Sequence, residues 1–193
     1  MKCMKYAVVY ILLLAGELLS QNPKYTTKYD GYFSKYCKRY FSVGFDWHWF
    51  KAQAIAESDL NKDAESWCKA KGIMQLLPST FAELCERYPE LKKNIRDPRW
   101  NIAAGIRYDR DLWIQWKAER PFQDRLHFTF GSYNAGLGTL LKAQEMCMVQ
   151  NLNENLWQSI ERVAPTVEVW RHDETINYIK RINKVYSEIS SSP

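Results

Sequence analysis

A chain of 193 residues with 46% hydrophobic and 15% aromatic residues can bury the core of one domain, which excludes an intrinsically disordered protein. Its formal charge of +5 and pI of about 8.9 suit polyanionic surroundings such as a cell wall or a nucleic acid. The lysines and arginines form no dense block, and the sequence has no zinc-finger spacing and no RNP-like aromatic strand, so we expect no nucleic-acid partner.

The first 20 residues have the layout of an export signal. Lys2 and Lys5 precede an apolar run over residues 6–16, and Glu17 begins a polar stretch. The run is shorter than the roughly 20 apolar residues that span a membrane, but its cleavage site is poorly defined. A signal peptide and an uncleaved anchor that associates with the membrane through residues 6–16 both remain open, and a buried first helix is the weaker alternative. We expect an exported protein of the periplasm or cell envelope.

The chain from residue 30 onward has apolar residues at helical spacing, separated by short turns. Asp46 is placed to cap a helix that runs to about Ser58. Further helices are expected from Pro78, from Asp97 and Pro98, from about Pro121 to Tyr133, and from about Asp173 to Ile189. The residues expected on buried helix faces are Phe50, Ala54, Ile55, Phe81, Leu84, Cys85, Ile102, Ile106, Leu112 and Trp113. Because no stretch alternates apolar and polar residues, we predict an all-α fold.

The sequence divides into an export segment and one helical domain. Residues 1–20 are the signal peptide or anchor, and residues 21–44 form a lead-in helix region. Residues 45–189 form the domain itself, and the serine-rich residues 190–193 are expected to be a disordered tail.

The cysteines of the exported part allow a disulfide framework. In an oxidising compartment they permit two disulfides, with three connectivities that the sequence does not rank. These cysteines are Cys37, Cys68, Cys85 and Cys147. No pair has the CxxC spacing of a zinc site, and the three histidines are scattered singly, so we expect neither a metal nor a cofactor.

Glu57 is the candidate catalytic acid. It ends the apolar helix face and is followed by Ser58, Asp59 and the turn-forming Asn61. Partial desolvation at such a place keeps a carboxyl protonated near neutral pH, as a general acid requires. A lone glutamate at a helix end is more often simply solvated, so the assignment depends on the motifs that follow.

Those motifs, in order, are the Glu57-Ser58 pair, GIMQLLPSTF from Gly72, DPRWNIAAGIRY from Asp97, SYNAG from Ser132 and ETINYI from Glu174. In this order and spacing they resemble the catalytic domain of bacterial lytic murein transglycosylases of the soluble type, most closely the C-terminal domain of the membrane-bound F type. The resemblance covers about residues 45–186 and implies a lysozyme-like, goose-type helical fold. The departures are Ile73 for a leucine, Ser132 for an alanine and Lys62 for a proline, and they affect packing and turn stiffness.

The resemblance also implies the site. Glu57 takes the family's catalytic position, and Ser66, Gln75 and Tyr133 are expected to orient the substrate and the acid. Met74 is expected to pack beneath a sugar. The full set of implied substrate-binding residues is Ser66, Met74, Gln75, Tyr133, Asn134, Glu174 and Tyr178. Of these, Asn134 is expected to tie the backbone of the site together rather than to orient the substrate.

The implied reaction cleaves the MurNAc-GlcNAc bond of peptidoglycan glycan strands and forms 1,6-anhydro-MurNAc with a single carboxylate. One alternative is goose-type lysozyme-like hydrolysis, with Asp59 or Asp63 activating a water, although aspartates are favoured in such turns for capping alone. Another is a non-catalytic wall-binding or secretion-assembly module, against which the retained Glu57 argues. The tryptophans Trp67, Trp100, Trp113 and Trp116 suit sugar stacking or, more commonly, the core.

Overall fold

The computed structural model describes residues 26–91 and 94–190. Its elements are α2 (Asp30–Tyr40), α3 (His48–Ser58), α4 (Pro78–Arg87), α5 (Pro98–Gln115), α6 (Phe122–Ala135), α7 (Leu137–Val149), α8 (Trp157–Val163), the short 3-10 helix η1 (Ala164–Thr166) and α9 (His172–Ser190). Isolated bridges join Glu65 to Lys71 and Lys71 to Leu76, and the described part contains no strand. The predicted all-α fold is confirmed. The export segment and residues 191–193 of the expected tail lie outside the described residues.

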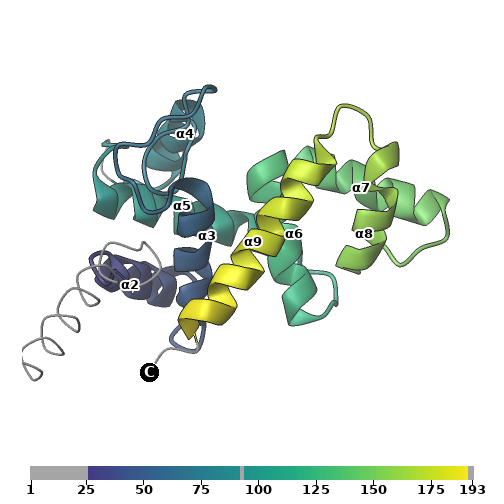
Figure 1. Ribbon diagram of the computed structural model, residues 1–193, viewed down its shortest axis with the longest axis horizontal. Helices are drawn as coiled ribbons and strands as arrows, with labels where there is room; N and C mark the ends of the chain where they lie inside the picture. The colour runs from purple at the N-terminus through teal and green to yellow at the C-terminus, as the bar shows by residue number, and fades with distance from the viewer. Residues whose placement is uncertain (1–25, 92–93, 191–193) are drawn as a thin grey trace, which may run out of the picture.

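Helix α9 crosses the middle of the molecule (Figure 1). It packs along α3 and also contacts α6, while α2 packs against α5 and α5 against α6. Helices α7 and α8 lie beyond α6, on the side away from α2. The C-terminal end of α3 is therefore enclosed between helices that come from both halves of the chain. No described helix combines the length and the apolar character that crossing a bilayer requires.

The helix boundaries follow the capping signals in the sequence. The Asp46 carboxylate accepts a hydrogen bond from the His48 amide at 3.0 Å, and the Asp97 carboxylate accepts from the Arg99 and Trp100 amides. Pro78 and Pro98 open α4 and α5, where a missing amide proton costs nothing. The predicted positions of α3, α4, α5, α6 and α9 are confirmed within one or two residues.

The core is continuous and rich in aromatic side chains. Phe50 of α3 contacts Phe41 and Phe45, and the Phe45 ring meets the ring of Trp113 edge-on at 5.5 Å. All the predicted buried helix faces are buried. Trp113 and Trp116 belong to the core and Trp100 is partly buried against it, whereas Trp67 is 86% exposed.

The structure contains none of the disulfides that the sequence left open among these four cysteines. Cys37, Cys85 and Cys147 are buried within three different helices, and the exposed Cys68 lies in a turn. The Cys37 thiol donates a hydrogen bond to the Phe45 carbonyl, and burial raises its pKa to about 12. This thiol packs as a small apolar group.

Candidate active site

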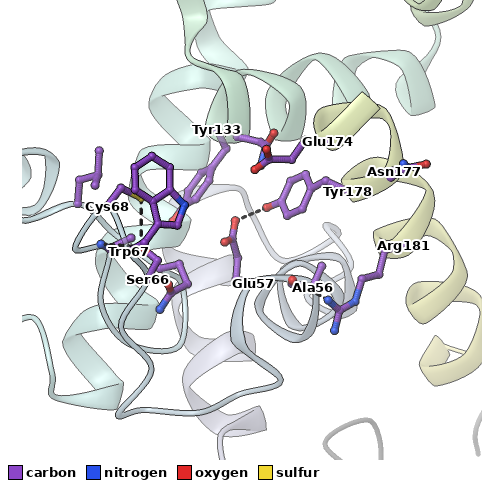
Figure 2. A pocket seen from close by; sticks show the side chains of 14 residues that line it. Ala56, Glu57, Ser66, Trp67, Cys68, Tyr133, Glu174, Asn177, Tyr178 and Arg181 are labelled. Atoms are coloured by element: carbon purple, nitrogen blue, oxygen red, sulfur yellow. Dashed lines mark hydrogen bonds between the residues drawn. The ribbon is translucent and has the colours of Figure 1, made fainter. Parts of the chain in front are cut away.

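A cavity of about 520 Å³ opens where the end of α3 meets the turn after it, the end of α6 and the first half of α9. Figure 2 shows Glu57 at its centre, with Tyr178 pointing to it from α9 and Arg181 ending beside Ala56. The predicted residues that line the cavity with Glu57 are Ser66, Gln75, Tyr133, Asn134, Glu174 and Tyr178. Segments separated by up to 121 residues thus meet at one carboxyl group.

Glu57 is a partly buried carboxyl held in one orientation. Its Oε1 accepts a hydrogen bond of 2.6 Å from the Tyr178 hydroxyl (Figure 2). Desolvation raises the pKa of Glu57 to about 7, against the lowering effects of the Tyr178 hydrogen bond and the Arg181 charge. A carboxyl with this pKa can both give and take a proton near neutral pH, which is the property that general acid–base catalysis needs.

Arg181 and Ser58 fix the helix end that carries Glu57. The Arg181 guanidinium donates to the Ile55 and Ala56 carbonyls and to the Asp59 carboxylate at 2.9–3.2 Å. The Ser58 hydroxyl donates to the Ile73 carbonyl at 2.8 Å. A cation that satisfies the last carbonyls of a helix is stabilising, because those groups lack partners within the helix. The position of Glu57 is therefore set by contacts on both sides of the cavity.

Two further predicted residues connect the walls of the cavity. The Tyr133 hydroxyl donates to the Met74 carbonyl at 2.7 Å, and burial raises the pKa of Tyr133 well above its ordinary value. Asn134 accepts from the Thr175 hydroxyl at 2.8 Å, which links α6 to α9. Asn134 thus joins the two helices through a bond between side chains, and it also lines the cavity.

Met74 is the predicted site residue that the structure does not bring into the cavity. Its side chain is fully buried against Gly105, where an added Cβ would lie 2.7 Å from the Met74 Cγ. The expected contact between this side chain and a sugar is corrected to a packing role. What Met74 supplies to the site is its carbonyl oxygen, which accepts from Tyr133.

The turn that carries Met74 and Gln75 depends on Asn101 of α5, which the sequence analysis missed. Asn101 is fully buried, accepts from the Met74 amide at 2.7 Å, and donates to the Lys71 and Ile95 carbonyls. Gly72 has a φ of +78°, and a Cβ there would lie 2.6 Å from the Asn101 Nδ2. The sequence did contain a signal for Asn101, because this residue places a polar side chain on the buried face of a predicted helix.

Gln53 and Asp109 form a second buried polar pair that the sequence analysis missed. The Gln53 amide donates to the Asp109 carboxyl at 3.2 Å, and both side chains are fully buried. Burial and the neighbouring Glu57 charge hold the pKa of Asp109 well above its usual range. Gln53 lies four residues before Glu57, and Asp109 interrupts the apolar stripe of α5, so their positions in the pattern were informative.

The aspartates considered as a second carboxylate lie outside the cavity lining. The Asp59 side chain is 60% exposed and pairs with Arg181, and Asp59 itself ends α3 with a left-handed φ of 51°. The Asp63 side chain is 67% exposed and pairs with Lys62. Both side chains therefore form ion pairs in the turn after α3 and do not line the cavity. Within the described part of the chain, no cluster of three or more His, Cys, Asp or Glu side chains is arranged to hold a metal ion.

The family model and the similar proteins identified by sequence comparison all carry the name transglycosylase. The family described as "Transglycosylase SLT domain" matches residues 37–155. The membrane-bound lytic murein transglycosylase F of Shewanella pealeana is 27% identical over 84% of this chain and 34% of the relative. Its namesake from Desulfosudis oleivorans is 31% identical over 74% of this chain and 33% of the relative. The chain therefore spans about a third of the length of these relatives.

Solved structures share the fold. The lytic transglycosylase Slt of Pseudomonas aeruginosa superposes with a TM-score of 0.67 at 20% identity, covering 87% of this chain and 25% of that one. The 70 kDa soluble lytic transglycosylase of Escherichia coli superposes with a TM-score of 0.60 at 22% identity, covering 85% of this chain and 25% of that one. The predicted lysozyme-like helical fold is confirmed by this likeness.

Proposed function

This chain belongs to the transglycosylase SLT domain family, and from that premise we propose that it is a lytic transglycosylase that cleaves the MurNAc-GlcNAc β-1,4 bond of peptidoglycan. The observation that carries the proposal is the Glu57 carboxyl, with a pKa of about 7, at the centre of an open cavity. The names of the relatives support the same activity and the same substrate.

The proposed mechanism uses Glu57 twice. It first protonates the glycosidic oxygen, while the acetamido oxygen of the MurNAc ring attacks its own anomeric carbon and the C–O bond to the leaving sugar breaks. The resulting carboxylate then takes the proton of the C6 hydroxyl, whose oxygen attacks the anomeric carbon, displaces the acetamido oxygen and closes the 1,6-anhydro ring. A second protein carboxylate is not needed because the substrate supplies the nucleophile.

The surroundings of Glu57 favour this mechanism over hydrolysis. Glu174 is the other carboxylate among the described lining residues, and it is half exposed and paired with Arg171 at 3.1 Å. Asp59 and Asp63 are held in the turn after α3 by Arg181 and Lys62. Attack within the substrate also has a high effective concentration, which a water without a dedicated base does not match.

The products of digestion test this assignment. Mass spectrometry of muropeptides released from purified sacculi should show 1,6-anhydro-MurNAc ends, which are lighter by one water than the reducing ends made by hydrolysis. The Asp59→Asn and Asp63→Asn variants should keep their activity and give the same products. A digest dominated by reducing ends, or loss of activity in either variant, would establish the goose-type hydrolytic reaction instead.

The location of the protein is part of the proposal. Lys2, Lys5 and the apolar run over residues 6–16 support export, and the curated relatives are named as membrane-bound. A reporter that is active only outside the cytoplasm, fused after Ser20, should be active. An inactive fusion that stays in the cytoplasm would contradict the proposed location.

A further inference from the structure

Trp67 is the most exposed large aromatic side chain of the described residues, and it lines the Glu57 cavity. It is 86% exposed, whereas Trp113, Trp116 and Trp157 are buried in the core. Scattered exposed apolar residues are normal on protein surfaces and carry no meaning alone. The position of Trp67 is what distinguishes it, because Figure 2 shows it on the side of the cavity opposite Tyr178.

The backbone that carries Trp67 is a closed turn, here called the Trp67 turn (residues 65–71). Ser66 and Ala70 pair across it, since the Ser66 amide donates to the Ala70 carbonyl at 3.0 Å and the Ser66 hydroxyl accepts from the Ala70 amide at 3.0 Å. The Lys69 amide donates to the Ser66 carbonyl at 2.9 Å, which leaves Trp67 and Cys68 at the two central positions. These bonds fix the backbone from which the indole projects, and such preorganisation of the backbone lowers the entropic cost of binding.

The two walls of the cavity differ in chemistry. Trp67 and the 41% exposed Leu77 give one wall an apolar character. The α9 wall offers Glu174, Asn177 and Arg181, which are hydrogen-bonding and charged groups. A pyranose ring has the matching character, with C–H groups on its faces and hydroxyl and acetamido groups on its edges. Binding cavities commonly combine apolar surface with a few polar groups that fix orientation in this way.

We propose that Trp67 is a substrate-binding residue whose indole stacks on a sugar ring of the glycan strand while the α9 wall binds the edges of that ring. The inference rests on the proposed function and deepens it, since it names the side chain that holds the strand beside Glu57. An aromatic face contributes both buried apolar area and a quadrupole that attracts C–H groups.

Binding of soluble, uncrosslinked peptidoglycan glycan strands to the Glu57→Gln protein tests the inference. Adding Trp67→Ala should raise the dissociation constant about tenfold, whereas Trp67→Phe, which keeps an aromatic face, should raise it less than about threefold. In the otherwise unchanged enzyme, Trp67→Ala should raise KM and leave kcat within about twofold. Stacking should also change the intrinsic fluorescence on binding, and Trp67→Phe should remove that change although seven of the eight tryptophans remain.

The matched control is Val149→Ala, which shortens a 73% exposed apolar side chain at the far end of α7 and should leave binding unchanged. Trp67→Ala should unfold at the same urea concentration as the parent, because an exposed indole contributes little to the core. A dissociation constant within twofold of the parent in Trp67→Ala would overturn the inference and leave the proposed function standing. If the Glu57→Gln protein binds no glycan and the parent cleaves none, the proposed function fails and the inference fails with it.

Discussion

The Glu57→Gln variant is expected to cleave peptidoglycan about 10²- to 10⁴-fold more slowly than the parent, which is the usual contribution of general acid–base catalysis. Glutamine keeps the shape of the side chain, and its amide oxygen can still accept the hydrogen bond from Tyr178. What it lacks is an exchangeable acidic proton. The rate of release of soluble muropeptides from purified sacculi measures the effect.

Glu174→Gln is the matched control, because it neutralises the other carboxylate among the described lining residues. This side chain is half exposed, pairs with Arg171 and belongs to the wall proposed to bind the sugar edges, so its neutralisation should weaken binding and lower activity by no more than about tenfold. If Glu57→Gln cleaves at nearly the parental rate, or if Glu174→Gln is the variant that loses activity, the assignment of Glu57 as the acid is wrong.

A stability measurement shows that the inactive variant is folded and reports on the same carboxyl. The pKa of Glu57 rises from 4.5 to about 7 on folding, so the folded state keeps a proton that the unfolded state releases. Its stabilising contribution is complete below about pH 4.5 and is lost as the pH rises through about 7. Glutamine does not titrate. The free energy of unfolding of Glu57→Gln should therefore increase relative to the parent from about pH 4 to about pH 8, and a constant difference in urea titrations would contradict the desolvation of Glu57.

The helices that the sequence predicted are those with local signals. The Asp46 carboxylate accepts from the first amide of α3, Asp97 caps α5, and α4 and α5 have a proline in the first turn. Helices α7 and α8 were not predicted as separate elements. Helix α7 begins directly after Gly136, whose φ of 89° breaks the chain from α6 without a side-chain cap, and α8 has only seven residues. A helix of two turns shows too little periodicity to be recognised.

The site was predictable where motif residues carry the chemistry, and unpredictable where a side chain binds distant backbone. Glu57 and Tyr178 were both identified, although the hydrogen bond between them was not. Asn101 accepts from an amide 27 residues away, and Arg181 donates to a carbonyl 125 residues away. A sequence pattern records which side chains are polar and buried, but the partner is fixed only when the chain folds.

Asn101 leads to the prediction with the largest expected effect on stability. Asn101→Ala should lower the free energy of unfolding by about 3 kcal/mol, because it leaves the Met74 amide and the Lys71 and Ile95 carbonyls without their side-chain partner. The Met74 amide carries most of this cost, since it is buried and loses a bond of 2.7 Å. Urea denaturation measures the change, with Asn177→Ala, at an exposed position of α9, expected within about 0.5 kcal/mol of the parent.

The same substitution should also lower activity in the fraction that remains folded. The Asn101 side chain holds the turn from Lys71 to Met74, and this turn supplies the carbonyl to which Tyr133 donates and the backbone on which Gln75 stands. We therefore expect Asn101→Ala to lose activity at temperatures where circular dichroism still shows the folded state. If the variant unfolds within about 0.5 kcal/mol of the parent, water replaces the amide at the turn and Asn101 does not hold this wall of the active site.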